Sequence, residues 1–306
     1  MNKILSRHIR YFKSNLGLTL IALPTIVYIF IFSYVPLYGL VLPFKDYKFA
    51  LGFWGSPWVG LANFEYLINS SLLTIVRNTV VMNALFIIIN VIVEVTLALL
   101  LFELGKRASK TYQTLLFLPF FISWIVASYA LYGFLDSDLG IVNKLIGVFG
   151  VEPILFYNEP KYWPFILVIV HVWKFIGYGT LMYYAALMGI DSEYYEAAKL
   201  DGASRFQQAI HVSLPMIRPI IVIMVILSIG SIFYADFGLF YSVPQDNALL
   251  YSATDVIDTY VYRALRTLGD FGMASAAGLV QSVCGFILVL LSNYVISKTS
   301  NDDKLF

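Results

Sequence analysis

Between two long apolar segments of this chain lies the stretch Glu196-Ala197-Ala198-Lys199-Leu200-Asp201-Gly202-Ala203, with Leu214-Pro215 a short distance downstream. Asp191 or Ser192 can cap the start of a helix here, because their side-chain oxygens accept a hydrogen bond from a free N–H group of the first turn. Gly202 is the residue type that most readily adopts the left-handed conformation that ends a helix. The stretch therefore predicts a short helix that ends at this glycine.

A second short helix is expected directly after Gly202. Ser204 can cap its start, and we expect the helix to run through His211 and to be stopped by Pro215 before the next apolar segment. The small alanine side chains allow another surface to approach the backbone closely. Residues 189–215 therefore predict a stiff, compact elbow of two short helices rather than a floppy linker.

The composition places the chain in a membrane. Hydrophobic residues make up 59% of the 306 residues and charged residues only 13%, well below the roughly 25% charged residues of soluble domains. The net charge of +1 gives no basic field for nucleic acid. The single cysteine, Cys284, lies in an apolar run, so no disulfide and no cysteine metal site is expected. The chain is predicted to be an all-helical integral membrane protein.

A membrane-spanning helix needs about 20 mostly apolar residues, and six segments meet this requirement: residues 16–42, 77–102, 112–135, 164–188, 216–241 and 273–297. The first segment is too long for a signal peptide and lacks an obvious cleavage site, so we expect it to be retained. The connections are too short for an independent domain, and no internal repeat is visible. Residues 1–306 are therefore expected to form one transmembrane domain.

The distribution of lysine and arginine sets the expected orientation. With the N-terminus and the C-terminus in the cytoplasm, twelve cationic residues fall on the inner side and seven on the outer side. The inner set is Lys3, Arg7, Arg10, Lys13, Lys106, Arg107, Lys110, Lys199, Arg205, Arg218, Lys298 and Lys304, and the outer set is Lys45, Lys48, Arg77, Lys144, Lys161, Arg263 and Arg266. This orientation places the elbow in the cytoplasm.

The elbow resembles the coupling loop of ABC-importer permeases, in which a Glu-Ala-Ala motif docks into a groove of an ATPase subunit. The resemblance rests on identities at fixed spacing, at Glu196, Ala197, Ala198, Gly202, Leu214 and Pro215. It implies the type I ABC importer permease fold. It also implies an ATPase-coupling role for Glu196, Ala197, Ala198, Asp201, Gly202, Ala203 and Pro215.

Further stretches are similar to permeases of the carbohydrate (maltose-type) family, and in part to its branch that imports complex oligosaccharides. They begin at Val35-Pro36-Leu37, Leu118-Pro119-Phe120, Trp173-Lys174-Phe175 and Asp258-Thr259-Tyr260. The resemblance implies a multi-pass permease subunit of the cell membrane that imports an oligosaccharide. It implies as partners a second homologous permease, a cytoplasmic ATPase dimer and an extracellular solute-binding lipoprotein.

The sequence carries no visible catalytic pattern. It contains no Gly-x-x-x-x-Gly-Lys-Ser/Thr motif for nucleotide phosphates and no His-Glu-x-x-His motif for a metal ion. We therefore expect no enzyme activity, no cofactor and no metal in this chain. By the resemblance, ATP and Mg are bound by the partner ATPase.

Three ionisable residues fall inside the expected spans, where a charge is costly and marks a functional candidate. Asp236 is expected near the outer end, Lys174 near mid-membrane and Glu94 toward the cytoplasmic half, at depths that differ in steps of roughly 8–9 Å. Lys174 can reach one carboxylate but not both. Two interpretations stay open: a structural ion pair, or a group that faces a cavity and binds sugar hydroxyls or an acidic sugar.

Aromatic side chains near the same positions can pack against the apolar faces of sugar rings. Trp173, Tyr178 and Tyr234 complete a candidate substrate pathway with Glu94, Lys174 and Asp236. The alternative role for each aromatic residue is anchoring at the membrane interface or packing between helices.

Two other functions are weighed against an importer subunit. An ion-coupled secondary transporter that uses Glu94 is the main alternative, but such carriers usually show inverted repeats, and none is visible. A membrane enzyme would need acidic residues or histidines clustered at one membrane face, whereas the acidic residues of this chain are scattered.

Overall fold

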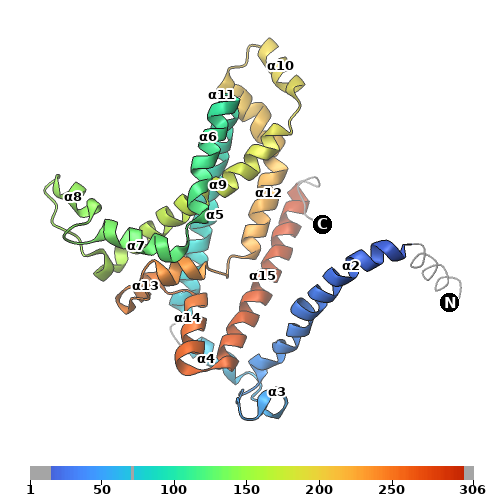
Figure 1. Cartoon of the computed structure of the whole chain (residues 1–306), viewed down its shortest axis with the longest axis vertical. Coiled ribbons are helices and arrows are strands. Elements are labelled where there is room, and N and C mark those ends of the chain that lie inside the picture. Colours follow the sequence, from blue (N-terminus) through green and yellow to red (C-terminus); the bar gives the residue numbers. More distant parts are fainter. Residues whose placement is uncertain (1–14, 70–71, 300–306) are drawn as a thin grey trace.

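The computed structural model describes residues 15–69 and 72–299, and the regular structure within them consists of helices (Figure 1). Five of these helices are long and apolar enough to cross a membrane, or six if the bent pair of residues 106–121 and 124–135 counts as one span. The prediction of an all-helical protein with several membrane spans is confirmed.

The long elements are α2 (Leu16–Ile29) with its continuations η1 (Phe30–Tyr34) and η2 (Val35–Phe44), α5 (Leu72–Glu103), α6 (Lys106–Phe117) with η3 (Leu118–Phe121), α7 (Trp124–Leu135), α9 (Trp163–Met188), α12 (Leu214–Gly230) and α15 (Phe271–Thr299). The short connecting elements are α3 (Gly52–Gly55), α4 (Ala62–Asn69), α8 (Ile141–Gly147), η4 (Phe156–Asn158), η5 (Pro160–Tyr162), α10 (Ser192–Leu200), α11 (Arg205–Gln208), η6 (Ala209–Ser213), η7 (Gly238–Ser242), η8 (Ala248–Leu250), α13 (Tyr251–Thr254), α14 (Ile257–Arg263) and η9 (Ala264–Leu268).

Four predicted spans match helices to within a few residues at their ends. The segments 16–42, 77–102, 164–188 and 273–297 correspond to α2 with η1 and η2, to α5, to α9 and to α15. Their long apolar runs carry no residue that stops the helix near the middle of the span.

The third predicted span, residues 112–135, is wrong as a single straight helix. The first half ends at Phe121, and α7 begins at Trp124 at an angle of 96° to it. Pro119 lacks the N–H group that a continuing helix uses. Ser123 restarts the helix, because its hydroxyl oxygen accepts a hydrogen bond from the N–H of Val126 at 3.3 Å.

The fifth predicted span, residues 216–241, also departs from a continuous helix. α12 ends at Gly230, and residues 231–236 are irregular. The amide of Asn83 on α5 donates to the carbonyls of Ile232 and Tyr234 at 2.8 and 3.0 Å. A neighbouring helix thus satisfies the backbone groups that the break sets free, as an apolar surrounding requires.

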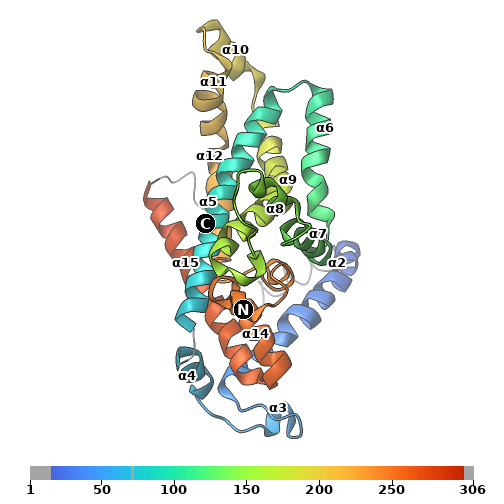
Figure 2. The ribbon, with the colours of Figure 1, turned by 90° about the vertical axis from the view of Figure 1, so that its left-hand side faces the viewer.

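α5 and α9 pack along each other at the centre of the bundle, and α12 packs against both of them and against α15 (Figure 1, Figure 2). Buried apolar residues such as Phe86, Leu167 and Leu187 fill the interior. In contrast, α2 has no buried residue and slants away from the bundle (Figure 1). α10 and α11 lie at one end of the molecule, and α3 and α4 lie at the other.

Five of the twelve cationic residues assigned to the inner side lie outside the described residues. Lys3, Arg7, Arg10 and Lys13 precede them, and Lys304 follows them. The placement of both termini on the cytoplasmic side therefore stays a prediction.

Candidate functional site

The first half of the elbow has the predicted local structure. Asp191 caps α10 by accepting a hydrogen bond from the N–H of Glu193 at 3.1 Å. Gly202 has a φ of +81°, and the N–H of Ala203 donates to the carbonyl of Ala198 at 2.9 Å. This pair of features is a Schellman ending, in which a left-handed residue turns the chain back over the last carbonyls.

The second half of the elbow differs from the prediction. Ser204 caps α11 in a reciprocal capping box with Gln207, as its sequence position indicates. The helix does not stop at Pro215, however, and residues 205–230 form one continuous helix. The π-helical segment η6 directly precedes Pro215, so the proline lies where the regular i→i−4 hydrogen-bond pattern of the helix is already interrupted.

Side-chain contacts fix the elbow to the ends of two long helices. The hydroxyl groups of Tyr195 and Ser213 lie 2.9 Å apart, and the ring of Tyr195 packs 5.5 Å from that of Phe102 at the end of α5. Arg205 forms an ion pair with Glu103, also on α5. These contacts link the elbow to the end of α5, and η6 of the elbow continues directly into α12.

The outer surface of the elbow is exposed. α10 has no buried residue, and the apolar side chain of Leu200 is 90% exposed. Of the seven predicted coupling residues, Glu196, Ala197, Asp201, Gly202 and Pro215 are exposed, and Ala198 and Ala203 are half-buried. Four of them, Ala198, Asp201, Gly202 and Ala203, line a hollow of about 240 Å³. The structure thus brings these residues together on a surface that a partner can reach.

A larger cavity of about 420 Å³ lies between α5, α9 and α12. It is lined by three of the six predicted pathway residues, Glu94, Tyr178 and Tyr234. Hydroxyl and amide groups line the rest of its polar wall, from Asn83, Asn90, Tyr183, Ser228 and Ser231, together with the ring of His171. These groups both donate and accept hydrogen bonds, so the wall can bind a ligand rich in hydroxyl groups.

Glu94 lies directly against the backbone of α9. A Cβ atom at Gly179 would lie 2.0 Å from the carboxyl carbon of Glu94, so a larger residue at this position would displace the Glu94 carboxylate. On the turn before Glu94, the side-chain oxygen of Asn90 is buried and has no hydrogen-bond partner within the protein. The wall of the cavity therefore contains a polar group whose hydrogen-bonding capacity the protein alone does not use.

Lys174 does not line this cavity, and no ion pair joins it to Glu94 or Asp236. Its ammonium group donates to the carbonyls of Phe120 and Ile122, and it lies 5.0 Å from the ring centre of Trp124. These carbonyls can accept from Lys174 because the third span is broken here, so they are not used in the hydrogen bonds of a continuous helix. The prediction assumed an unbroken helix, in which no such acceptors exist.

Asp236 is also held by structural contacts rather than facing the cavity. Its carboxylate accepts hydrogen bonds from the indole N–H of Trp124 at 2.9 Å and from the backbone N–H of Leu239 at 3.2 Å. Trp173 is 42% exposed and does not line the cavity. Of the six candidates, Trp173, Lys174 and Asp236 therefore do not line this cavity.

Sequence reasoning missed several cavity residues. Two of the missed residues, Asn83 and Asn90, lie on the same face of α5 as the predicted Glu94. Their separations of seven and four residues match two turns and one turn of a helix. This spacing of polar residues within an apolar segment was visible in the sequence. The contributions of Ser228 and Ser231 depend on how α12 packs against α5, which no local pattern shows.

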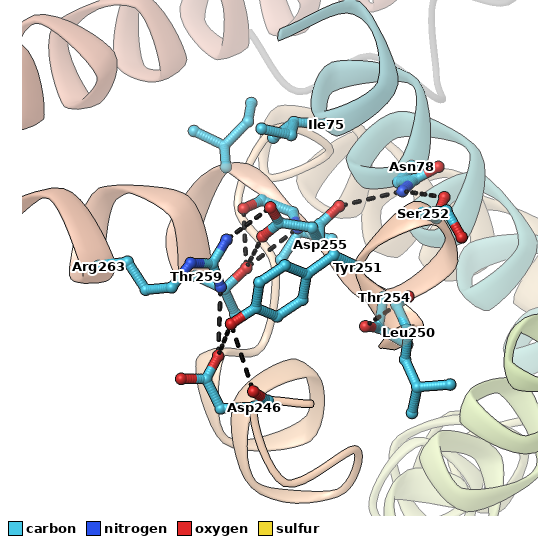
Figure 3. Close-up of polar contacts among 12 residues, drawn as sticks. Ile75, Asn78, Asp246, Leu250, Tyr251, Ser252, Thr254, Asp255, Thr259 and Arg263 are labelled. Carbon is cyan, nitrogen blue, oxygen red and sulfur yellow. Dashed lines mark hydrogen bonds and ion pairs between the residues drawn. The ribbon is translucent and has the colours of Figure 1, made fainter. Parts of the chain in front are cut away.

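A polar cluster at the far end from the elbow fixes the connection between α12 and α15 (Figure 3). Arg263 forms ion pairs with Asp255 and Asp246, at 2.5 and 3.3 Å, and its guanidinium group lies 4.2 Å from the ring centre of Tyr251. Nearby, the amide of Asn78 donates to the carbonyl of Asp255 at 3.1 Å. The cluster joins α13 and α14 to α5.

The same connection supports a wall of the cavity. Asp258 on α14 accepts a hydrogen bond from the N–H of Ala235 at 2.7 Å, and Gln281 on α15 donates to the carbonyl of Phe233 at 2.7 Å. The irregular segment that carries Tyr234 is therefore held from two sides. Among the described residues, no group of three or more His, Cys, Asp or Glu side chains is placed to hold a metal ion.

Comparisons with known proteins agree with this arrangement. The family model described as "Binding-protein-dependent transport system inner membrane component" matches residues 95–301. Protein LplB of Bacillus subtilis is 37% identical over 94% of this chain and 90% of its own length. The polygalacturonan/rhamnogalacturonan transport system permease protein YteP of the same species is 37% identical over 92% of this chain and 88% of its own length.

The fold is similar to that of a subunit in a crystal structure of a bacterial ABC transporter involved in the import of the acidic polysaccharide alginate. The TM-score is 0.86 at 30% identity, over 94% of this chain and 98% of that chain. A second crystal structure, of an alginate ABC transporter with an alginate pentasaccharide-bound periplasmic protein, gives a TM-score of 0.85. The chain belongs to the family of binding-protein-dependent transport system inner membrane components, the multi-pass permease subunits of ABC importers in the cell membrane.

Proposed function

We propose that this chain is one permease half of an ATP-driven importer of an oligosaccharide. Residues 1–306 form one transmembrane domain with six spans, and both termini and the coupling loop of residues 189–215 lie in the cytoplasm. A second homologous permease completes the pathway across the membrane. A cytoplasmic ATPase dimer binds ATP and Mg, and an extracellular solute-binding lipoprotein delivers the sugar. Permeases of this family are transport subunits rather than enzymes.

The observation that carries the coupling part of the proposal is the construction of the elbow. Its exposed residues Asp201 and Gly202 lie on the turn that is closed by the Schellman hydrogen bonds, and Glu196 lies in α10 just before it. The elbow also contacts α5 through Arg205 and Tyr195, and η6 continues directly into α12. A rigid knob joined to the helices that line the cavity is what a transmitted movement requires.

The cavity supports an oligosaccharide as the solute. Its wall combines tyrosine rings, which pack on the apolar faces of sugars, with amides and hydroxyl groups, which bind sugar hydroxyls. Glu94, Tyr178 and Tyr234 are the residues of this chain that we assign to the solute pathway. The relatives named for polygalacturonan/rhamnogalacturonan and for alginate transport are consistent with a sugar polymer as the substrate class.

The ion-coupled secondary transporter is not supported. The family match covers residues 95–301, a range that includes the elbow and most of the predicted spans. Glu94 is therefore better explained as part of the wall of a solute cavity than as the carboxylate of an ion-driven carrier.

A substitution in the elbow tests the coupling. In Gly202→Val, a β-branched residue is forced into a left-handed conformation, which strains the elbow. We expect the tagged variant to reach the membrane but to lose most of its co-purifying ATPase and its ATP-driven sugar uptake. Mass spectrometry of the material purified in mild detergent and uptake by whole cells measure the two effects.

The matched control is Gly147→Val, because Gly147 has an ordinary φ and open space around its Cβ position, far from the elbow. The control should keep the ATPase and the uptake of the wild type. Full uptake by Gly202→Val would contradict the coupling role of the elbow. Recovery of the wild-type chain without an ATPase or a second permease would contradict the proposed importer.

A further inference from the structure

A groove of about 390 Å³ lies between α6 and α9, outside the solute cavity and the elbow. Lys110, Gln113, Thr114, Phe117 and Phe121 line one side, and Leu181 of α9 lines the other. The separations of three, four, seven and eleven residues place the first set on one face of a continuous helical stretch. The groove is therefore a strip along one helix, and not a gap left by a loop.

The strip changes from polar to apolar along its length. Lys110, Gln113 and Thr114 form the end near the start of α6, which lies at the same end of the molecule as the elbow (Figure 2). Phe117 and Phe121 continue the strip toward the break in the third span, and the side chain of Phe121 is 75% exposed. A charged head followed by an apolar tail is the pattern that a phospholipid presents.

Positive charge gathers at the polar end. Lys106 and Arg107 lie one turn before Lys110, and the first turn of α6 contains no acidic residue. The carboxylate nearest in sequence, Glu103, is paired with Arg205. All three cations are exposed, and none forms an ion pair with another described residue. This group of charges is complementary to an anionic headgroup.

The walls of the groove are fixed by contacts between α6 and α9. Gln113 donates to the hydroxyl group of Ser109 at 2.9 Å, and that hydroxyl group donates to Tyr184 on α9 at 3.3 Å. At the apolar end, a Cβ atom at Gly177 would lie 2.1 Å from the carbonyl oxygen of Leu116, so the two helices touch backbone to backbone. The groove is thus formed before a ligand enters.

We propose that this groove binds one anionic phospholipid, with its phosphate at Lys110 and an acyl chain along Phe117, Phe121 and Leu181. An acyl chain is much narrower than a partner helix, whose diameter is about 10–12 Å, and the cationic end and the apolar end of the groove match the two parts of a single lipid. Clusters of basic residues at the cytoplasmic ends of membrane helices attract anionic lipids. The assignment of the lipid to the inner leaflet rests on the orientation given under the proposed function. The match between the groove and an anionic lipid rests only on the residues that line the groove and the cations beside it.

Native mass spectrometry of the purified importer, with added phosphatidylglycerol or phosphatidylcholine, tests the proposal. We expect one phosphatidylglycerol per chain to stay bound at collision energies that remove phosphatidylcholine. Lys110→Glu removes one positive charge and adds a negative one, and at about fivefold per charge it should weaken phosphatidylglycerol binding about 25-fold. Lys144→Glu on α8 is the matched control and should bind phosphatidylglycerol as the wild type does.

Thr114→Trp is a second variant, which fills the groove without changing its charge and should also expel the lipid. Equal retention of both lipids would overturn the proposal, and so would unchanged phosphatidylglycerol binding in both variants. Efficient cross-linking of Thr114→Cys, labelled with a thiol-reactive photo-cross-linker, to the second permease would overturn it as well, because a protein would then cover the groove. Co-purification of the ATPase is scored in the same preparations, so a failure of the lipid site is distinct from a failure of the importer proposal.

Discussion

The indole nitrogen of Trp124 donates a hydrogen bond to Oδ2 of Asp236 at 2.9 Å. Trp124 is the first residue of α7, and Asp236 ends the irregular segment after α12. The bond therefore joins the two interrupted helices at their breaks. Because Lys174 donates to the carbonyls of Phe120 and Ile122 and faces the same indole ring, one polar cluster holds both breaks together within the bundle.

Trp124→Phe should destabilise the protein, because Asp236 loses a charge-assisted hydrogen bond in an apolar surrounding. We expect the free energy of unfolding to fall by about 2 kcal/mol, measured by SDS titration in mixed micelles. Trp54→Phe is the control, since the side chain of Trp54 is 81% exposed. Equal stabilities of the two variants would show that the bond between the two breaks contributes little.

Lys174→Met separates a structural role from a role in sugar binding. Methionine fills a similar space but leaves the carbonyls of Phe120 and Ile122 without their donor, at a cost of about 1–3 kcal/mol for each buried group. We therefore expect a lower yield of folded protein and an earlier SDS midpoint, with sugar affinity unchanged in the protein that remains. A variant of normal stability with a weakened sugar affinity would instead place Lys174 in the solute pathway.

Gly179→Ala should force the carboxylate of Glu94 out of its place, because the added Cβ would lie 2.0 Å from it. Overpacking of this kind costs about 1–3 kcal/mol, and sugar uptake should fall with it. Gly133→Ala is the control, since its Cβ position has no neighbour within 4 Å.

The double variant Glu94→Ala, Gly179→Ala removes the clash. It should be more stable than Gly179→Ala alone, and this non-additivity is the signature of direct contact. Additive effects of the two substitutions would contradict the contact between Glu94 and α9.

Arg263→Gln should leave the carboxylate of Asp255, whose side chain is 10% exposed, without its cation. Removing one partner of such an ion pair costs about 3 kcal/mol, so the SDS midpoint should fall clearly. Arg266→Gln is the control, since Arg266 lies one turn further along and is exposed. Similar midpoints for both variants would show that the cluster around Arg263 does not stabilise the connection to α15.

The elbow shows how far local sequence signals reach. Asp191, Gly202 and Ser204 act as caps within four residues of the groups they satisfy, so their roles follow from the sequence alone. Pro215 was misjudged because the π-helical segment before it, which interrupts the regular hydrogen-bond pattern at the proline, was not foreseen. The long apolar segments were predictable for the same reason as the caps, since hydropathy is summed over neighbouring residues.

The solute cavity needed the tertiary structure. By itself, the sequence determined a membrane-embedded helical chain, the position of most spans and the caps of the elbow helices, because these depend on contacts between residues close in the chain. Only the tertiary structure decided that Glu94 meets Gly179, through the packing of α5 on α9, and that Lys174 and Asp236 meet Trp124, at the breaks of the third and fifth spans. A break frees backbone carbonyls and redirects the helix that follows, so it changes which side chains face each other across the bundle.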